Sequence, residues 1–438
     1  MPGEMHKVMG ELSWKSLSKE DQDLWDLSTA IPDEAPEFIR NLPQPKNVME
    51  KTGYYSLFLD LMGWRKCNFL KTPEYMLSDE RPVPHGYADC DMNMCMTSEH
   101  CADAESTRRI LRQFVPRLVA SIHSHRMEEA ALWGGLLAHF IQDGSALGHI
   151  FPNAMFYDFS TEGKNHLHYH SLIDGCEPEL ETEQPALLGE SESELIFRLA
   201  MIGEKNLVTA KRSFFSMLEA CRAGDRKTMN KLARPLMQSA VFQVASLFHS
   251  TLALGLNRVK KEEAEKLKSF RLVEAEGHYH HPGGKYGHIM KGHNVVKGKK
   301  VALYIDCGNG NERRVEGFGM TSFVSVRYLL EPGVFDRLEG AVGLSSRYRH
   351  DQTPDMEVEF FIGVDKRYNR RVSGELDYGP GMKKVFSTAL KAGNPPRAFS
   401  AVVTGAKTVF LCAVSGLKSE KYNYPHIVVV DPRLGKKR

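Results

Sequence analysis

Five side chains whose types and spacing fit a metal site lie within a segment of 36 residues, in the order His, Asp, His, His, Asp. They are His139, Asp143, His149, His170 and Asp174. The segment from Ala130 to Ile141, which carries the first of them, otherwise has the apolar spacing of a buried helix. Burying an imidazole or a carboxylate costs several kcal/mol unless the group has a partner, and a metal ion is a common partner. The sequence therefore predicts a metal site.

The spacing indicates how these residues could share an ion. His139 and Asp143 are four residues apart, as are the last two of the set, so on a helix each pair projects from one face. Gly144 favours a break in the helix, which would let His149 turn towards the same cavity. Nitrogen and oxygen ligands suit Zn²⁺, and several carboxylates allow bridged ions. The alternative is that His139 is a hydrogen-bonded core histidine and that residues 166–170 form a polar loop.

The elements that must position these residues are helices. Residues 1 to about 266 have helical periodicity, and the long loops at 63–102 and 150–190 are expected to help build the site. Ser18 begins a capping-box pattern that predicts a short helix through Trp25 and Leu27. The longer predicted helices are Ala104 to Ile122, Met127 to Asp143, Glu192 to Cys221 and Lys227 to Leu256.

Beyond a charged segment at 260–268, short β-rich runs separated by Gly, Pro and Asn predict an antiparallel sandwich. The runs are Lys300–Ile305, Phe323–Leu330, Phe335–Val342, Met356–Val364, Lys384–Leu390, Ala398–Val403, Lys407–Val414 and His426–Val430. The expected fold class is multidomain, α then β. A helical domain over 1–268 would precede an antiparallel β-sandwich over 269–438.

The composition excludes some classes of function. With 57 Lys and Arg against 55 Asp and Glu, the formal charge of +2 offers no broad basic face for nucleic acid. No apolar stretch reaches the roughly 18 residues of a transmembrane helix. The N-terminal sequence lacks the pattern of a secretory signal, as in a cytosolic protein or one whose signal has been removed. Cys90, Cys95 and Cys101 lie close together, which fits a local disulfide and reduced thiols equally well.

The pattern H-x3-D-x5-H, followed by H-x3-D, resembles the superfamily of bacterial zinc-dependent phospholipases C and fungal single-strand nucleases/3′-nucleotidases. The resemblance implies an all-helical zinc phosphodiesterase domain. It implies that His139 and Asp143 bind a pair of zinc ions that Asp143 bridges. It also implies that His149, His170 and Asp174 hold a further ion.

The same family has an upstream Asp that bridges two zinc ions and is a candidate general base, and then a His. The Pro-Asp pair at Asp33 and the segment that starts at His85 resemble these two elements, so both residues are expected as ligands. Asp89 and Asp91 are competing candidates. The expected catalytic carboxylates are Asp33 and Asp143. The separation of 52 residues from Asp33 to His85 implies an insertion across 41–80 relative to compact members of the family.

A third zinc ion in the family is bound by the amino group and carbonyl of an N-terminal Trp and by a nearby His. His6 lies five residues after Met1, a spacing that resembles the nucleases and predicts His6 as a ligand. A surface histidine is the alternative interpretation. Because this chain has no Trp at its start, two or three zinc ions are expected.

The chemistry expected of such a cluster is phosphodiester hydrolysis. Two close zinc ions can bridge a hydroxide, since coordination lowers the pKa of water to about 7, and the hydroxide would attack phosphorus in line. A third ion would neutralise charge on the leaving oxygen. Phospholipase C is the expected type. Asp174 in place of Glu and the residues around His85 favour a nuclease acting on single strands or nucleotides, but no clear aromatic and basic strip accompanies them.

The segment 300–438 carries short motifs in an order that resembles the NPCBM family of carbohydrate-binding modules, which are galactose-binding-like jelly rolls. The motifs are Gly317–Met320, Phe335–Leu344, Glu357–Phe361, Gly393–Pro396, Tyr422–His426 and Asp431–Leu434. The resemblance implies a glycan partner, and the alternative is a jelly roll that only packs against the enzyme. Such folds can hold a structural Ca²⁺, although no dense acidic loop favours one here.

Two functions from different classes follow. One is an active zinc phosphodiesterase with a glycan-directed accessory domain. The other is a catalytically inactive glycan-binding protein that lacks the third zinc. The family resemblance implies a secreted or periplasmic protein.

Overall fold

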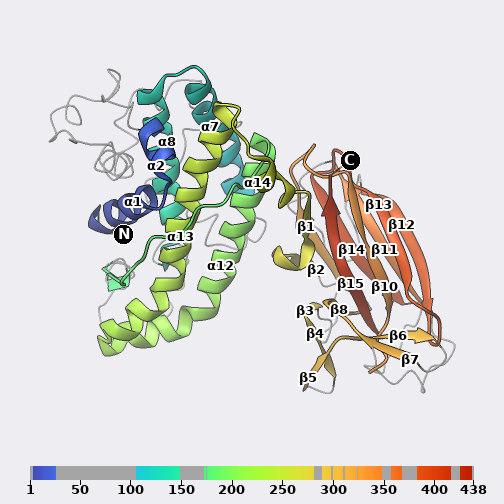
Figure 1. Ribbon diagram of the computed structural model, residues 1–438. Helices are drawn as coiled ribbons and strands as arrows, with labels where there is room; N and C mark the ends of the chain where they lie inside the picture. Colours follow the sequence, from blue (N-terminus) through green and yellow to red (C-terminus); the bar gives the residue numbers. More distant parts are fainter. Residues whose placement is uncertain are drawn as a thin grey trace. The chain divides into compact units, whose positions relative to one another are not determined.

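The computed structural model of the chain divides into two compact units, Met1–Leu267 and Lys268–Arg438. Figure 1 labels the helices and strands of each. The residues that the structure describes are 3–25, 105–147, 172–173, 175–280, 289–296, 299–308, 311–322, 324–347, 357–366, 382–415 and 425–436. The interpretation of the two units as a phosphodiesterase-like and a carbohydrate-binding-module-like domain stays a prediction.

The first unit is helical, as predicted. Its described helices are α1 (Gly3–Lys15), α2 (Lys19–Trp25), α7 (Glu105–His123), α8 (Met127–Asp143), α12 (Glu192–Ala223), α13 (Arg226–Gly255) and α14 (Lys261–Glu265). The predicted helix Met127 to Asp143 has those bounds in the structure, and the other three long helices end within two residues of prediction. None of the described helices is both long enough and apolar enough to cross a membrane.

Polar side chains cap the starts of α2, α12 and α13, and the cap of α12 is the Ser191 hydroxyl, which accepts from the Glu194 N–H. The Ser18 hydroxyl accepts a hydrogen bond from the Asp21 N–H at 3.1 Å, which confirms the predicted cap of α2. Helix α12 stops at Gly224, whose φ of 64° is left-handed and therefore favours glycine. Asp225 then caps α13, since its carboxylate accepts from the Thr228 N–H at 3.0 Å.

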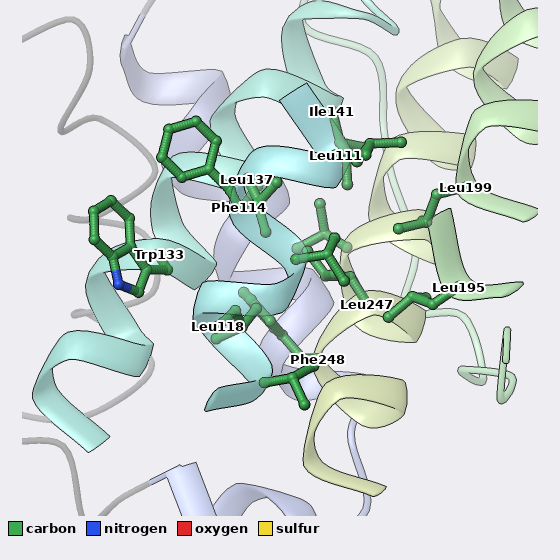
Figure 2. Packing of buried hydrophobic residues seen from close by; sticks show 14 of the residues in the cluster. Leu111, Phe114, Leu118, Trp133, Leu137, Ile141, Leu195, Leu199, Leu247 and Phe248 are labelled. Atoms are coloured by element: carbon green, nitrogen blue, oxygen red, sulfur yellow. The ribbon is translucent and has the colours of Figure 1, made fainter. Parts of the chain in front are cut away.

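Helices α7, α8, α12 and α13 bury a common apolar cluster, which Figure 2 shows from close by. The labelled residues are Leu111, Phe114, Leu118, Trp133, Leu137, Ile141, Leu195, Leu199, Leu247 and Phe248. Helix α8 contributes to this cluster along its length, from Ala130 to Ile141. Its last turn is therefore held firmly against the other helices.

Helix α1 joins the unit through a second buried cluster, in which its Met5 and Met9 lie with Val241 of α13. The Ser13 hydroxyl of α1 also donates to the Val241 carbonyl at 3.2 Å. These contacts fix the position of α1, so a polar residue on its inner face can be presented to α8.

The second unit is built from short strands and one 3-10 turn, η6 (Leu272–Glu274). The strands are β1 (Ser269–Arg271), β2 (His278–His280), β3 (Ile289–Lys291), β4 (His293–Val296), β5 (Lys299–Ala302), β6 (Tyr304–Gly308), β7 (Asn311–Arg314), β8 (Gly317–Thr321), β9 (Val324–Leu329), β10 (Arg337–Leu344), β11 (Glu357–Asp365), β12 (Lys383–Lys391), β13 (Arg397–Val402), β14 (Thr408–Ser415) and β15 (His426–Gly435).

Besides two-stranded sheets that pair β4 with β5 and β6 with β7, the described part of this unit contains two large antiparallel sheets. One has the order β13-β10-β15-β8-β3 with β1 added beside β15, and the other has the order β12-β11-β14-β9-β2. From β8 to β15 the chain alternates between the sheets at every step except β11 to β12, which is a jelly-roll arrangement of eight strands. Side chains of the two sheets meet between them, for example Phe360 and Phe399 with ring centroids 6.1 Å apart. The predicted antiparallel β-sandwich is confirmed.

Two strand predictions need correction. Lys300–Ile305 was expected as one run, but β5 and β6 separate at the buried Leu303. Strand β8, which begins at Gly317, was not predicted, because glycine is depleted in strands and resembles a turn signal. A Cβ at Gly317 would collide with the Val429 carbonyl oxygen, so close backbone approach requires glycine there.

Four cysteines are described as free thiols: Cys176, Cys221, Cys307 and Cys412. Burial raises the pKa of Cys221 to about 11, which makes its thiolate scarce at neutral pH. The three clustered cysteines, Cys90, Cys95 and Cys101, lie outside the described residues, so the predicted alternatives for them stay open.

Candidate metal centre

Three of the predicted ligands come together where α1 meets the last turn of α8. Ligand atoms of His6, His139 and Asp143 all lie within 4.8 Å of one another. The three residues are 1%, 1% and 6% exposed, so the group is buried inside the helical unit. His139 and Asp143 share one face of α8, as their four-residue spacing predicts, and α1 supplies the third side chain from 133 residues away in the sequence.

The carboxylate of Asp143 faces both imidazoles. Its Oδ1 is 3.4 Å from His6 Nε2, and its Oδ2 is 3.1 Å from His139 Nε2. The two imidazole rings are stacked, with centroids 4.2 Å apart and planes inclined by 11°. One carboxylate thus faces two imidazole nitrogens, each through a different oxygen.

The electrostatics of the group favour a neutral His6. Burial is the largest cause that lowers the pKa of His6, and the neighbouring His139 lowers it further. Hydrogen bonding and charge at Asp143 raise the pKa of His6 but do not reverse the net shift. The neutral imidazole is the form that binds metal ions.

The set of donors fits zinc. Two imidazole nitrogens and a carboxylate oxygen are ligand types that zinc prefers, and a catalytic zinc commonly has three protein ligands. Both oxygens of Asp143 face the group, which is the arrangement that a carboxylate bridging two ions requires.

Gln142 is a polar member of this site that the sequence analysis did not single out. Its side chain is fully buried and hydrogen-bonds to His6 at two points: His6 Nδ1 lies 2.7 Å from Gln142 Oε1, and Gln142 Nε2 donates to the His6 carbonyl at 3.3 Å. The sequence did contain a signal for Gln142. A glutamine beside a predicted ligand in an otherwise apolar helix must have a buried hydrogen-bond partner.

The chain leaves the helix directly after Asp143. Gly144 and Ser145 form a turn, and the Ser145 hydroxyl accepts a hydrogen bond from Asn206 Nδ2 of α12 at 3.1 Å. The helix break that the sequence predicted after Asp143 is therefore present. His149, which it was expected to redirect, lies outside the described residues.

The remaining predicted ligands also lie outside the described residues. They are Asp33, His85, His149, His170 and Asp174, together with the competing candidates Asp89 and Asp91. Their sequence neighbours Leu147 and Ile173 are described, and both belong to the buried cluster that contains Met5 and Met9 of α1.

No protein-family model matches the chain, and no curated protein matches it. Among solved structures, the CBM51-2 and INT domains of Clostridium perfringens ZmpB match 39% of this chain at 16% identity, with a TM-score of 0.29. The CBM51 of the Clostridium perfringens GH95 in complex with methyl-galactose matches 38% at 20% identity, with a TM-score of 0.28. The alpha toxin of Clostridium absonum matches 99% at 12% identity, with a TM-score of 0.31.

The extent of these matches differs. They span 32% of the ZmpB structure, 99% of the GH95 module and 94% of the alpha toxin. Within this chain, the matches with CBM51 domains cover 38–39% and the match with the alpha toxin covers 99%. Likenesses this weak do not establish a function.

Proposed function

We propose that the helical unit is a zinc-dependent phosphodiester hydrolase of the phospholipase C type. The observation that carries this proposal is the buried convergence of His6, His139 and Asp143. A purely structural cluster would have less reason to place two buried imidazoles beside one carboxylate, since hydrophobic residues would fill the same space without the desolvation cost.

In the proposed site, His6, His139 and Asp143 would hold zinc, with Asp33 and His85 as the further ligands of the paired site. His149, His170 and Asp174 would hold the remaining ion. The location of Leu147 and Ile173 in the same apolar cluster as α1 supports this, because each is close in sequence to a proposed ligand.

Zinc supplies Lewis acidity, which polarises phosphoryl oxygens and makes water acidic enough to be a nucleophile near neutral pH. The chain's own residues orient the reaction. Asp143 and Asp33 are proposed to hold or remove the proton of the attacking water. The apolar clusters around α1 and α8 exclude bulk water, which strengthens electrostatic interactions at the site.

The proposed substrate is a phospholipid headgroup ester. The near-neutral charge of the chain, +2 overall, supports this choice over single-stranded nucleic acid, which binds to positively charged grooves. We further propose that the jelly-roll unit binds a glycan and that the protein acts outside the cytosol. A structural Ca²⁺ in the jelly roll stays an untested alternative.

Metal analysis of protein purified without chelator tests the proposal first. Two or three zinc ions per chain are expected, and fewer than about one would reject the enzyme and leave an inactive glycan-binding protein. Hydrolysis of phosphatidylcholine, single-stranded DNA and 3′-nucleotides by the same preparation then tests the substrate. Faster turnover of either nucleic-acid substrate would replace phospholipase C with the nuclease alternative.

A matched pair of variants links activity to the site. His139→Ala should abolish both zinc binding and hydrolysis of bis-p-nitrophenyl phosphate. His249→Gln alters a histidine of α13 that also faces carboxylates but lies outside the proposed centre, and it should preserve both.

A further inference from the structure

Gln142 joins α1 to α8 through a pair of buried hydrogen bonds. The distances are 2.7 Å from His6 Nδ1 to Gln142 Oε1 and 3.3 Å from Gln142 Nε2 to the His6 carbonyl oxygen. Because neither residue is more than 1% exposed, water cannot readily replace either bond. The amide oxygen and the amide nitrogen of Gln142 thus both hydrogen-bond to the same residue of α1, His6.

The pair of bonds determines which way the amide points. A backbone carbonyl oxygen only accepts hydrogen bonds, so the amide NH₂ of Gln142 must face it. The opposite orientation would bring two acceptor oxygens together. The Gln142 carbonyl oxygen is thereby directed at His6 Nδ1.

The orientation of the amide in turn determines the proton on His6. An amide oxygen only accepts, so Nδ1 must carry the hydrogen at a separation of 2.7 Å. In a neutral imidazole one nitrogen carries hydrogen and the other has the lone pair. Nε2 lies 3.4 Å from Asp143 Oδ1, which is a longer separation than the 2.7 Å at Nδ1, so a neutral His6 keeps its hydrogen on Nδ1 and has its lone pair on Nε2.

We propose that Gln142 is a positioning residue, which selects the His6 tautomer that presents an unprotonated Nε2 to the metal centre. The purpose of this selection rests on the proposed zinc function. A ligand histidine commonly donates its second N–H to a partner that sets its tautomer and orientation. Here the partner is the neutral amide of Gln142, in the helix that carries the other two ligands. Gln142 therefore fixes the position of α1 against α8 and also orients His6 for metal binding.

The tautomer itself can be measured in metal-free protein. At pH 8, above the ordinary pKa of histidine, an imidazole is mostly neutral, so ¹⁵N NMR of labelled histidine reports which nitrogen bears hydrogen. The wild-type protein should show His6 with Nδ1–H. A His6 with Nε2–H in the folded wild type would overturn the proposal without any variant.

Two substitutions separate the two hydrogen bonds. Gln142→Met keeps the length of the side chain but removes both bonds, so Nε2–H should become populated and zinc affinity should fall about 10- to 100-fold. Gln142→Glu retains an acceptor for Nδ1–H, so the tautomer should be preserved. Gln243→Met is the matched control, since Gln243 is also buried (3% exposed) and bonds only within α13 to Ser239.

The outcomes distinguish the two proposals. If the wild type binds zinc but Gln142→Met changes neither tautomer nor affinity, the role of Gln142 is wrong and the zinc proposal survives. If the tautomer responds as expected in a protein that binds no zinc, the positioning by Gln142 holds and the metal function fails.

Discussion

Two groups in the helical unit bring histidine and carboxylate together, and they shift the pKa of histidine in opposite directions. In the metal centre, the single carboxylate of Asp143 faces two stacked imidazoles, and the pKa of His6 is lowered. On α13, His249 lies between two carboxylates, at 2.7 Å from Asp21 and 3.0 Å from Glu263, and its pKa is raised, chiefly by the hydrogen bond to Asp21.

The comparison shows that the ratio of carboxylates to imidazoles and the depth of burial together determine whether the pKa of a histidine is raised or lowered. Only a protonated imidazole has two N–H groups, so only that form can donate to both Asp21 and Glu263. His249 therefore serves as a cation that fastens α2 and α14 to α13. In the metal centre, deep burial and a second imidazole disfavour a proton on His6, which leaves it suited to bind a metal ion.

The largest effect is expected from Asp143→Asn, which removes the charge that faces both imidazoles. Zinc affinity should fall more than about 100-fold, beyond the loss typical when a residue that only hydrogen-bonds to a ligand is changed. Competition with a chelator of known affinity measures it. Asp21→Asn, in the group around His249, provides the control and should leave zinc affinity unchanged. An equal loss of zinc affinity in Asp21→Asn would show that the two groups do not differ in metal binding.

Removal of zinc should destabilise the wild type, because an ion bound only to the folded state stabilises it by mass action. At free zinc about 100-fold above the dissociation constant the difference should be about 2.7 kcal/mol. Thermal unfolding with and without chelator measures this difference. His139→Ala should show almost no response to zinc, and a full response would mean that the ion binds elsewhere.

The His249 group should make stability depend on pH in a defined direction. Its raised pKa means that the stabilisation is complete below the ordinary value of 6.5 and is lost as the pH rises through the raised pKa. The advantage of wild type over His249→Gln should be on the order of 1 kcal/mol at pH 5.5, allowing for solvent screening, and should shrink towards pH 9. Urea unfolding at both pH values tests this, and an advantage that grows with pH would be inconsistent with a charged His249.

The smallest effect is expected from Ser18→Ala, which removes the hydroxyl that caps α2 through the Asp21 N–H. Loss of such a cap costs roughly 1 kcal/mol. Because Asp21 also holds His249, the pH dependence of stability should weaken as well, while zinc content stays that of the wild type. A change in zinc content instead would indicate that the two groups are coupled.

Local patterns in the sequence predicted the long helices and most strands of the sandwich, since periodicity is set by which face is buried. They also placed His139 and Asp143 on one face of α8. Gln142 was missed because its role depends on α1 docking against α8, 136 residues apart in the chain. The His249 group was missed for the same reason, as Asp21 is 228 residues away. His6 came from a resemblance in spacing rather than from any local pattern.

The first and last strands of the jelly-roll unit lie side by side. Its first strand, β1, pairs with its last strand, β15, so that Ser269 lies opposite Gly435, and the Lys436 N–H donates to the Lys268 carbonyl. The polypeptide thus enters and leaves the unit at neighbouring points. A unit of this kind can be inserted into a surface loop of another protein as a cassette, or circularly permuted with a short linker, without separating the segments that flank it.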